Sequence, residues 1–198
     1  GYLQYHTSPI EDMNLTFQIG REKFTFGYGY NSKLAVSGNH PTMDFLKFNF
    51  DYGIVNFTSI HASTVGEFSH IHEERFTKYF AMNRFKFSFN NLADFGIGEI
   101  IVYSGRGLEL AYLNPLLFYK FAEMSLQDRD NGTVFLDFQS KFLKNLELQG
   151  TFFLDENILG HLQNMSRFSN KTAYQLGVMW YEAFWVDDLT LFAEYTKI

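Results

Sequence analysis

Apolar and polar residues alternate along much of the chain with a period of two. In residues 45–53, for example, Leu46 and Phe48 fall on one face, and Lys47 and Asn49 fall on the other. Because successive side chains of a β-strand point to opposite faces, this pattern predicts half-buried strands. The same alternation recurs in five further stretches, at residues 84–91, 134–142, 146–156, 173–184 and 189–198.

Turn-forming residues separate these stretches. They gather in five segments, at residues 90–96, 128–132, 142–145, 166–171 and 185–188. The connections are alternately short and longer, which is typical of an antiparallel meander built from hairpins. The sequence therefore predicts an all-β fold of about eight to ten strands, in a single domain that spans residues 1–198.

The apolar face of these strands is unusually aromatic. The chain holds 24 Phe and 12 Tyr residues, yet its mean hydropathy is −0.17. No apolar run approaches the roughly 18 residues of a transmembrane helix. A soluble sandwich would pair two such faces in its interior, whereas a transmembrane β-barrel would turn them to lipid and line a lumen with the polar faces. Periodicity does not distinguish these two architectures.

Six glycines interrupt the strand-like patterns. A glycine inside a strand marks a bend or a close approach of two backbones. We therefore expect one of these two features at each of Gly27, Gly29, Gly96, Gly98, Gly150 and Gly177.

One apolar segment, residues 105–121, lacks a clean alternation. Asn114 is a favoured helix N-cap, and Pro115 suits the first helical position. The run from there to about Ser125 is apolar on nearly all sides, which predicts one short buried helix near 115–125. Such a helix would plug a barrel or cover an open sheet face.

Charge and cysteine content exclude several functions. The net charge is −6 and no basic run occurs, so we expect no nucleic-acid partner. The chain has no cysteine, which excludes a disulfide framework and a thiol nucleophile. No cofactor-binding fingerprint is present, and we expect no cofactor. The last strand-like run stops without a turn, so we expect the chain to be a section of a larger protein.

The histidine-rich stretch at residues 70–74 is the one candidate for a metal site. His70 and His72 would share a face of an extended segment, beside Glu73 and Glu74. A third ligand is not evident, and a zinc site requires at least three protein ligands. We therefore favour solvent-exposed loop residues and predict no metal.

Two pairs of adjacent carboxylates could supply the acid and base of a glycosidase. These pairs are Asp155 with Glu156 and Asp187 with Asp188. Adjacent residues on a strand point to opposite faces, which weakens each pair as a catalytic site. We therefore favour solvated carboxylates near turns and predict that the protein is not an enzyme.

A set of charged residues could form a network inside a barrel, because buried charges need partners. Its members are Glu99, Arg106, Glu109, Asp130, Asp137 and Glu194. We favour a structural role over a lumen that binds sugar or ions.

Several aromatic residues, which we expect to be exposed, could stack on sugars, although in a barrel they are more often part of an interfacial girdle. They are Tyr28, Tyr30, Tyr103, Trp180 and Trp185.

Three motifs follow one another within residues 96–139. An E-x-x-x-Y-x-G-R element covers 99–106, a Y-L-N-P element covers 112–115, and a D-N element covers 130–131. In order and spacing they resemble the central signature of the Wzi-type capsule-assembly outer-membrane proteins. Residues 21–39 are similar to a strand of that family with W-G-x-G, although Phe26 replaces the tryptophan. Further similarities lie near Asp155 and at Glu194 and Tyr195.

This resemblance implies a β-barrel with an occluded lumen in the bacterial outer membrane. Such proteins assemble or attach capsular or other surface polysaccharide without catalysis, so the implied partners are surface polysaccharide and outer-membrane lipid. A porin and a soluble carbohydrate-binding or glycan-hydrolysing β-protein remain alternatives. The residues expected to bind polysaccharide or form the lumen network are Glu99, Tyr103, Arg106, Glu109, Asn114, Asp130, Asn131, Asp155 and Glu194.

Overall fold

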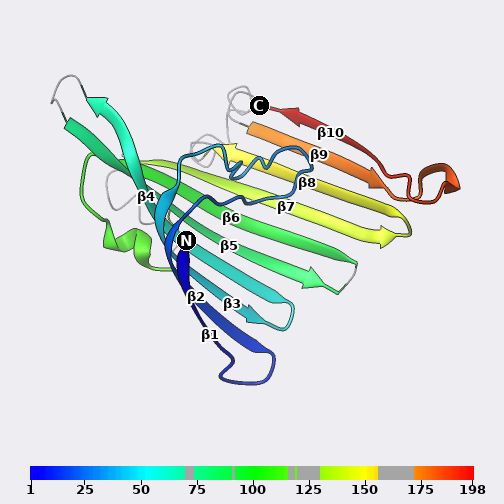
Figure 1. Ribbon diagram of the computed structural model, residues 1–198, viewed down its shortest axis with the longest axis horizontal. Helices are drawn as coiled ribbons and strands as arrows, with labels where there is room; N and C mark the ends of the chain where they lie inside the picture. Colours follow the sequence, from blue (N-terminus) through cyan, green and yellow to red (C-terminus); the bar gives the residue numbers. More distant parts are fainter. Residues whose placement is uncertain (70–73, 91, 116–118, 120–129, 156–171) are drawn as a thin grey trace, which may run out of the picture. The chain divides into compact units, whose positions relative to one another are not determined.

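The computed structural model describes residues 1–69, 74–90, 92–115, 119, 130–155 and 172–198. Within these residues, ten strands form one antiparallel sheet in the order of the chain (Figure 1). The strands are β1 Tyr2–Thr7, β2 Met13–Glu22, β3 Met43–Tyr52, β4 Val55–Ser69, β5 Glu74–Phe89, β6 Ala93–Ser104, β7 Asn131–Leu143, β8 Leu146–Asp155, β9 Thr172–Trp180 and β10 Leu191–Lys197.

The predicted all-β antiparallel meander is therefore confirmed. Tight turns connect several of the hairpins, and they use backbone conformations that suit their residues. Gly53 lies between β3 and β4 with a φ of 55°, and Asn145 lies between β7 and β8 with a φ of 60°. Gly and Asn adopt this left-handed region more readily than other residues. Each of the six quoted alternating stretches coincides with strand along most of its length.

One predicted strand is absent. The Phe24–Asn39 segment has no strand, and its sheet-like pairing consists of an isolated bridge between Phe26 and Val36. Gly27 and Gly29 lie inside the segment with φ values of 98° and 157°, and the first is far from strand geometry. The family-like strand expected at residues 21–39 is therefore wrong beyond Glu22.

The chain divides into two compact units. The first comprises Gly1–Lys23, His40–Phe85 and Gly98–Thr133, and the second comprises Phe24–Asn39, Lys86–Ile97 and Val134–Ile198. Each contains part of the sheet and one segment that packs on it.

The second unit has one polar face and one apolar face on β8, β9 and β10. Cross-strand partners point to the same face, so the pairing of Gln149 with Gly177 and of Gly177 with Glu194 defines a polar row. The neighbouring apolar row aligns Gly150, Leu176 and Tyr195. The apolar face thus extends across all three strands, whereas the polar face also includes Met179 and Phe192, which lie in the row of Glu147.

The first unit has one apolar face on β1, β2 and β3. One of its rows aligns Leu3, Ile19 and Leu46, and the next aligns Tyr5, Phe17 and Phe48. The opposite face is mixed, with one row of Gln4, Gln18 and Lys47 and another of Tyr2, Gly20 and Phe45. The rows of the apolar face continue into β4 at His61 and Ser59. Leu46 and Phe48, which the sequence pattern placed on the same face, therefore lie on one face in the structure.

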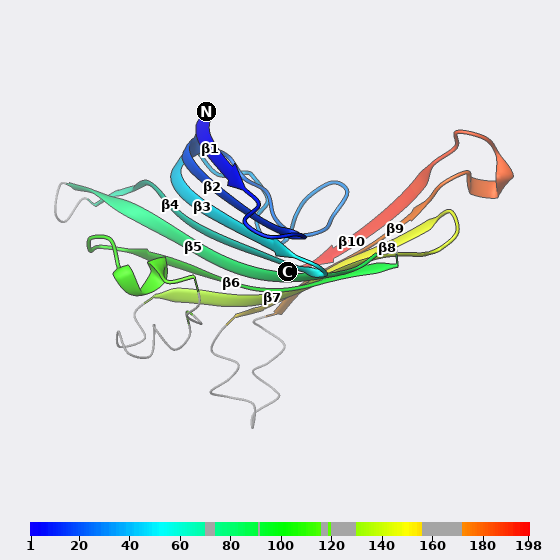
Figure 2. The same cartoon turned by 90° about the horizontal axis from the view of Figure 1, so that it is seen from below.

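The predicted helix near 115–125 lies mostly outside the described residues. Just before it, Leu110–Leu113 forms a short 3-10 helix, η1, and Asn114 follows at its C-cap in an extended conformation. η1 packs against one face of the neighbouring strands (Figure 2). A second 3-10 helix, η4, covers Ala183–Trp185. No helix in the described part of the chain is long and apolar enough to cross a membrane.

Candidate functional site

In the second unit, the polar face of β8 and β9 is buried beneath the Phe24–Asn39 segment (Figure 1). Gln175 is 1% exposed and Thr151 is 2% exposed. We call this region the covered polar face and define it by Glu147, Gln149, Thr151, Gln175 and Glu194. Burial of so many polar side chains costs free energy unless each finds a hydrogen-bond partner.

The covering segment supplies many of these partners from its backbone. The Tyr30 N–H donates to the Glu194 carboxylate at 2.6 Å, and the Gln175 side-chain amide donates to the Ser32 carbonyl at 3.0 Å. The Thr151 hydroxyl donates to the Tyr28 carbonyl at 3.4 Å. A segment with no secondary structure of its own must satisfy its backbone groups elsewhere. Here the polar strand side chains do so.

Glu147 receives hydrogen bonds from two phenols. The hydroxyls of Tyr181 and Tyr30 donate to its Oε2 and Oε1 at 3.2 and 3.4 Å, and the Lys141 ammonium lies 3.8 Å from Oε2. Burial is the main reason that the pKa of Tyr30 is raised to about 12, and the charge of Glu147 acts in the same direction. Tyr30 therefore keeps its proton at physiological pH and remains a hydrogen-bond donor.

Glycines permit the close approach of the segment to the strands. A Cβ at Gly29 would lie 1.8 Å from the Ser32 carbonyl oxygen and 2.9 Å from Gln175 Oε1. A Cβ at Gly177 of β9 would lie 2.9 Å from the Tyr30 ring. At these two positions, any larger residue would force the segment to move. Gly29 and Gly177 therefore leave room for close contacts, and at Gly177 the neighbour is the Tyr30 side chain rather than a second backbone.

In the first unit, a second cluster forms around Tyr103 of β6. Its buried members are Tyr103, Tyr112, Tyr119, Ala81 and Ile101. The Tyr103 ring stacks on Tyr79 with centroids 4.9 Å apart and an interplanar angle of 19°. This Tyr103 cluster attaches the chain around η1 to the strand face.

The Tyr103 hydroxyl joins three elements. It accepts a hydrogen bond from the Glu109 N–H at 3.2 Å, and it lies 2.9 Å from His61 Nε2. The hydrogen bond from Glu109 uses a lone pair of the oxygen and leaves the hydroxyl proton available to donate to His61. Tyr103 was expected among the exposed aromatic residues, and that expectation is wrong, since it is buried.

Arg106 and Asp130 form an ion pair beside this cluster. The Arg106 guanidinium contacts the Asp130 carboxylate, whose side chain is 2% exposed, and the Tyr112 hydroxyl donates to the same carboxylate at 2.6 Å. Arg106 also lies over the Tyr103 ring, 5.1 Å from its centroid. The hydrogen bond to Asp130 is the largest cause of the raised pKa of Arg106. The guanidinium therefore stays charged.

The structure gathers part of the predicted network. Arg106, Asp130, Tyr103 and Glu109 contact one another, with 3.8 Å between Arg106 Nε and the Glu109 carboxylate. Glu99 is buried nearby and accepts a hydrogen bond from the Tyr119 N–H at 2.9 Å.

Four predicted residues lie elsewhere or are not placed in the network. Glu194 belongs to the covered polar face of the second unit. Asn114 and Asn131 are exposed. Asp155 ends β8, and its side chain lies outside the described residues. Asp137, which was also considered for the network, is buried on β7 in the second unit.

The candidate catalytic and metal-binding residues are either exposed or outside the described part of the chain. Asp187 and Asp188 lie in an exposed turn after η4, as expected for solvated carboxylates. Glu156 and the residues of the candidate metal stretch, His70, His72 and Glu73, lie outside the described residues. Among the residues that are described, no three His, Asp or Glu side chains gather in a way that could hold a metal ion.

The sequence did not indicate the partners of the covered polar face. Ser32 and the backbone of Tyr28 and Tyr30 were read as part of a strand, whereas they cover β8 and β9. The paired glycines around Tyr28 were the available signal, because they permit a close approach of the backbone.

Trp185, expected among the exposed aromatic residues, is 92% exposed.

The comparisons with known proteins identify no relative. No family model, no curated protein and no solved structure gives a significant match to this chain.

Proposed function

We propose that this chain forms part of the wall of a bacterial outer-membrane β-barrel. In this proposal the barrel takes part, without catalysis, in the assembly or attachment of capsular or another surface polysaccharide. The ten-stranded antiparallel meander is the type of sheet from which such barrels are built.

The observation that carries the proposal is the exposure of the apolar face. On β9 and β10, Leu176 is 52% exposed and Tyr195 is 58% exposed, whereas Gln149 and Gln175 on the opposite face are buried. A water-soluble domain buries its continuous apolar face, because this burial is the main driving force of folding. The reverse arrangement stabilises a strand whose apolar face contacts lipid.

The first unit supports the same conclusion independently. Leu3, Tyr5, Phe17, Ile19 and Leu46 are all exposed, and they form a continuous patch on β1, β2 and β3. A soluble monomer rarely exposes a contiguous apolar patch of this kind without a binding role. In the proposed barrel, the part of the patch that η1 does not cover contacts the hydrocarbon of the membrane.

The covered polar face favours an occluded lumen over an open porin. The Phe24–Asn39 segment occupies hydrogen-bonding groups that would otherwise line a water-filled channel. A general porin needs those groups solvated, since its interior is polar and open to water.

The polysaccharide role rests on the resemblance of residues 96–139 to the Wzi-type proteins. In this proposal the Tyr103 cluster serves as the anchor of the η1 region.

The proposal is tested with the complete gene product in its own cells. Membrane fractions are extracted with detergent and run unheated and boiled on a denaturing gel. We expect extraction only with detergent and a heat-dependent change in mobility, as for a closed membrane barrel. A soluble protein with no mobility change would contradict the membrane assignment.

The polysaccharide role needs a separate measurement. Deletion of the gene is expected to reduce the cell-bound fraction of the surface polysaccharide and to increase the fraction in the medium. Restoration of the gene is the control. Unchanged attachment, together with solute uptake that depends on the gene, would instead support the porin alternative.

A further inference from the structure

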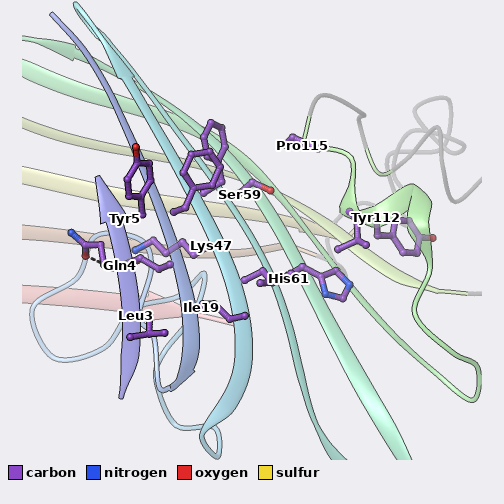
Figure 3. A pocket seen from close by; sticks show the side chains of 14 residues that line it. Leu3, Gln4, Tyr5, Ile19, Lys47, Ser59, His61, Tyr112 and Pro115 are labelled. Atoms are coloured by element: carbon purple, nitrogen blue, oxygen red, sulfur yellow. Dashed lines mark hydrogen bonds between the residues drawn. The ribbon is translucent and has the colours of Figure 1, made fainter. Parts of the chain in front are cut away.

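The exposed apolar face of the first unit contains a groove beside η1. The groove encloses about 480 Å³, a volume in the range of small-molecule sites. Figure 3 shows Leu3 and Tyr5 of β1 on one side of it, Tyr112 and Pro115 on the other, and His61 between them. The η1 region therefore turns a flat strand surface into a concave one.

The lining of this groove is mainly hydrocarbon. Phe17, Ile19 and Phe48 form its wall on β2 and β3. Its polar members offer few groups to a ligand: His61 Nε2 contacts the Tyr103 hydroxyl, and Gln4, Gln18 and Lys47 belong to rows whose side chains point to the opposite face of the strands. A sugar would leave its hydroxyl groups without partners here, which is unfavourable. An apolar chain suits the groove better.

A second cavity, of about 610 Å³, continues from the first. The two cavities share Ile19, Leu46 and His61, and the second one adds Arg21 and Asp44. These two side chains form a bidentate ion pair, with Arg21 Nε and Nη2 at 2.7 and 2.6 Å from the Asp44 carboxylate oxygens. Both side chains are more than half exposed, so a ligand can reach each of them.

The exposed ion pair complements a headgroup that carries both charges. A phosphate can bind the N–H groups of the Arg21 guanidinium that do not contact Asp44, because a guanidinium has five N–H donors. An ammonium group on the same headgroup can pair with Asp44. A purely anionic headgroup would gain the first contact and meet the charge of Asp44 at the second. The two ends of the continuous groove therefore match the two ends of one amphiphile.

We propose that this groove binds a zwitterionic phospholipid, with an acyl chain against Phe17 and Phe48 and a phosphoethanolamine headgroup at Arg21 and Asp44. The inference rests on the proposed function, because a lipid reaches this face when the face lies in a membrane. It adds a specific lipid site to the general contact of a barrel with the bilayer.

The test is native mass spectrometry of the complete protein after removal of lipid in detergent. The probes are phosphatidylethanolamine and phosphatidylglycerol with identical acyl chains. We expect one phosphatidylethanolamine to bind at the lowest lipid concentrations, at least about tenfold more tightly than phosphatidylglycerol. Asp44→Asn is expected to remove this preference, because it removes the charge that pairs with the ammonium group.

Filling the groove provides the second arm. Ile19→Trp keeps the face apolar and places a larger ring where the two cavities meet, and Leu46→Trp does the same from β3. Both variants are expected to lose the bound lipid. Leu176→Trp is the matched control, since it is equally exposed on an apolar face of the other unit, and it should retain lipid binding.

The outcomes separate this inference from the proposed function. Equal binding of both lipids by the wild type, or full binding by both groove variants, would overturn the lipid site. A dimer that Ile19→Trp dissociates would show that a second copy fills the groove, and this too would overturn it. In either case the heat-dependent mobility of the protein would persist. Loss of that mobility in the wild type would instead contradict the barrel.

Discussion

Arg106→Met is the substitution with the clearest expected cost. Methionine keeps much of the apolar length of the arginine and removes its charge. The Asp130 carboxylate, whose side chain is 2% exposed, then retains the Tyr112 hydroxyl and loses its cationic partner. Removal of one member of a buried ion pair typically costs 3–5 kcal/mol. Because the Arg106 side chain is 22% exposed, we expect the lower end, about 3 kcal/mol.

The free energy of unfolding is measured by urea titration of the detergent-solubilised protein, followed by far-ultraviolet circular dichroism. With a urea dependence of about 2 kcal/mol/M, a loss of about 3 kcal/mol lowers the midpoint by about 1.5 M. Arg21→Met is the matched control. It breaks an ion pair in which both partners are exposed, so the midpoint should stay near that of the wild type.

The double variant Arg106→Met/Asp130→Asn separates the lost pair from the charge left behind. It should recover part of the stability, because no buried charge then lacks a partner. A midpoint for Arg106→Met equal to that of Arg21→Met would contradict the expected cost of breaking the buried ion pair. The Arg106–Asp130 pair would then not stabilise the attachment of the η1 region.

Three further predictions concern the segment that covers the polar face. Gly29→Ala should speed amide hydrogen exchange of Tyr30, because its Cβ would meet the Ser32 carbonyl; Gly53→Ala, which has open space around its Cβ, should leave that amide unchanged. Glu194→Leu should speed the same amide by about tenfold or more, whereas Glu194→Gln keeps an acceptor and should have a smaller effect. The pKa of Tyr30 is raised, so its contribution to stability is complete below pH 10 and is lost as the pH approaches 12; a pH titration of unfolding should show a flatter profile for Tyr30→Phe. Unchanged exchange in Gly29→Ala, or identical pH profiles, would contradict the described contacts.

The strands could be predicted because their pattern is local. In β8, the alternation of Leu146, Glu147, Leu148 and Gln149 is the alternation of the two faces, and strand pairing continues the apolar face into β9 at Trp180 and Val178. No other part of the molecule is needed to explain it. Which face is buried could not be predicted, because an alternating strand is equally compatible with either.

The site could be predicted in part. The sequence motifs brought Tyr103, Arg106 and Asp130 into one hypothesis because buried charges need partners, and the structure joins them. Glu194 was placed in the same network by its residue type. Its partner is the backbone N–H of Tyr30, and such a group carries no signature in the sequence.

The prediction of secondary structure was wrong over the longest stretch at the Phe24–Asn39 segment. Alternating aromatic residues and glycines resemble a strand, and the pattern contains no information about distant hydrogen-bond partners. The segment lies where Thr151 and Gln175 can hydrogen-bond its backbone, contacts between residues more than 100 positions apart. Long-range satisfaction of backbone groups overrides local strand preference here.

The central claim is that the apolar face of the strands contacts lipid, and spin labels on β9 test it most directly. The chain has no cysteine, so single cysteines at residues 175, 176, 177 and 178 give unique labels on the protein in lipid bilayers. The account predicts high oxygen accessibility at 176 and 178, and low accessibility to both oxygen and a water-soluble nickel complex at 175 and 177. Labels at 176 and 178 that are accessible to the nickel complex instead would place this face in water and contradict the account.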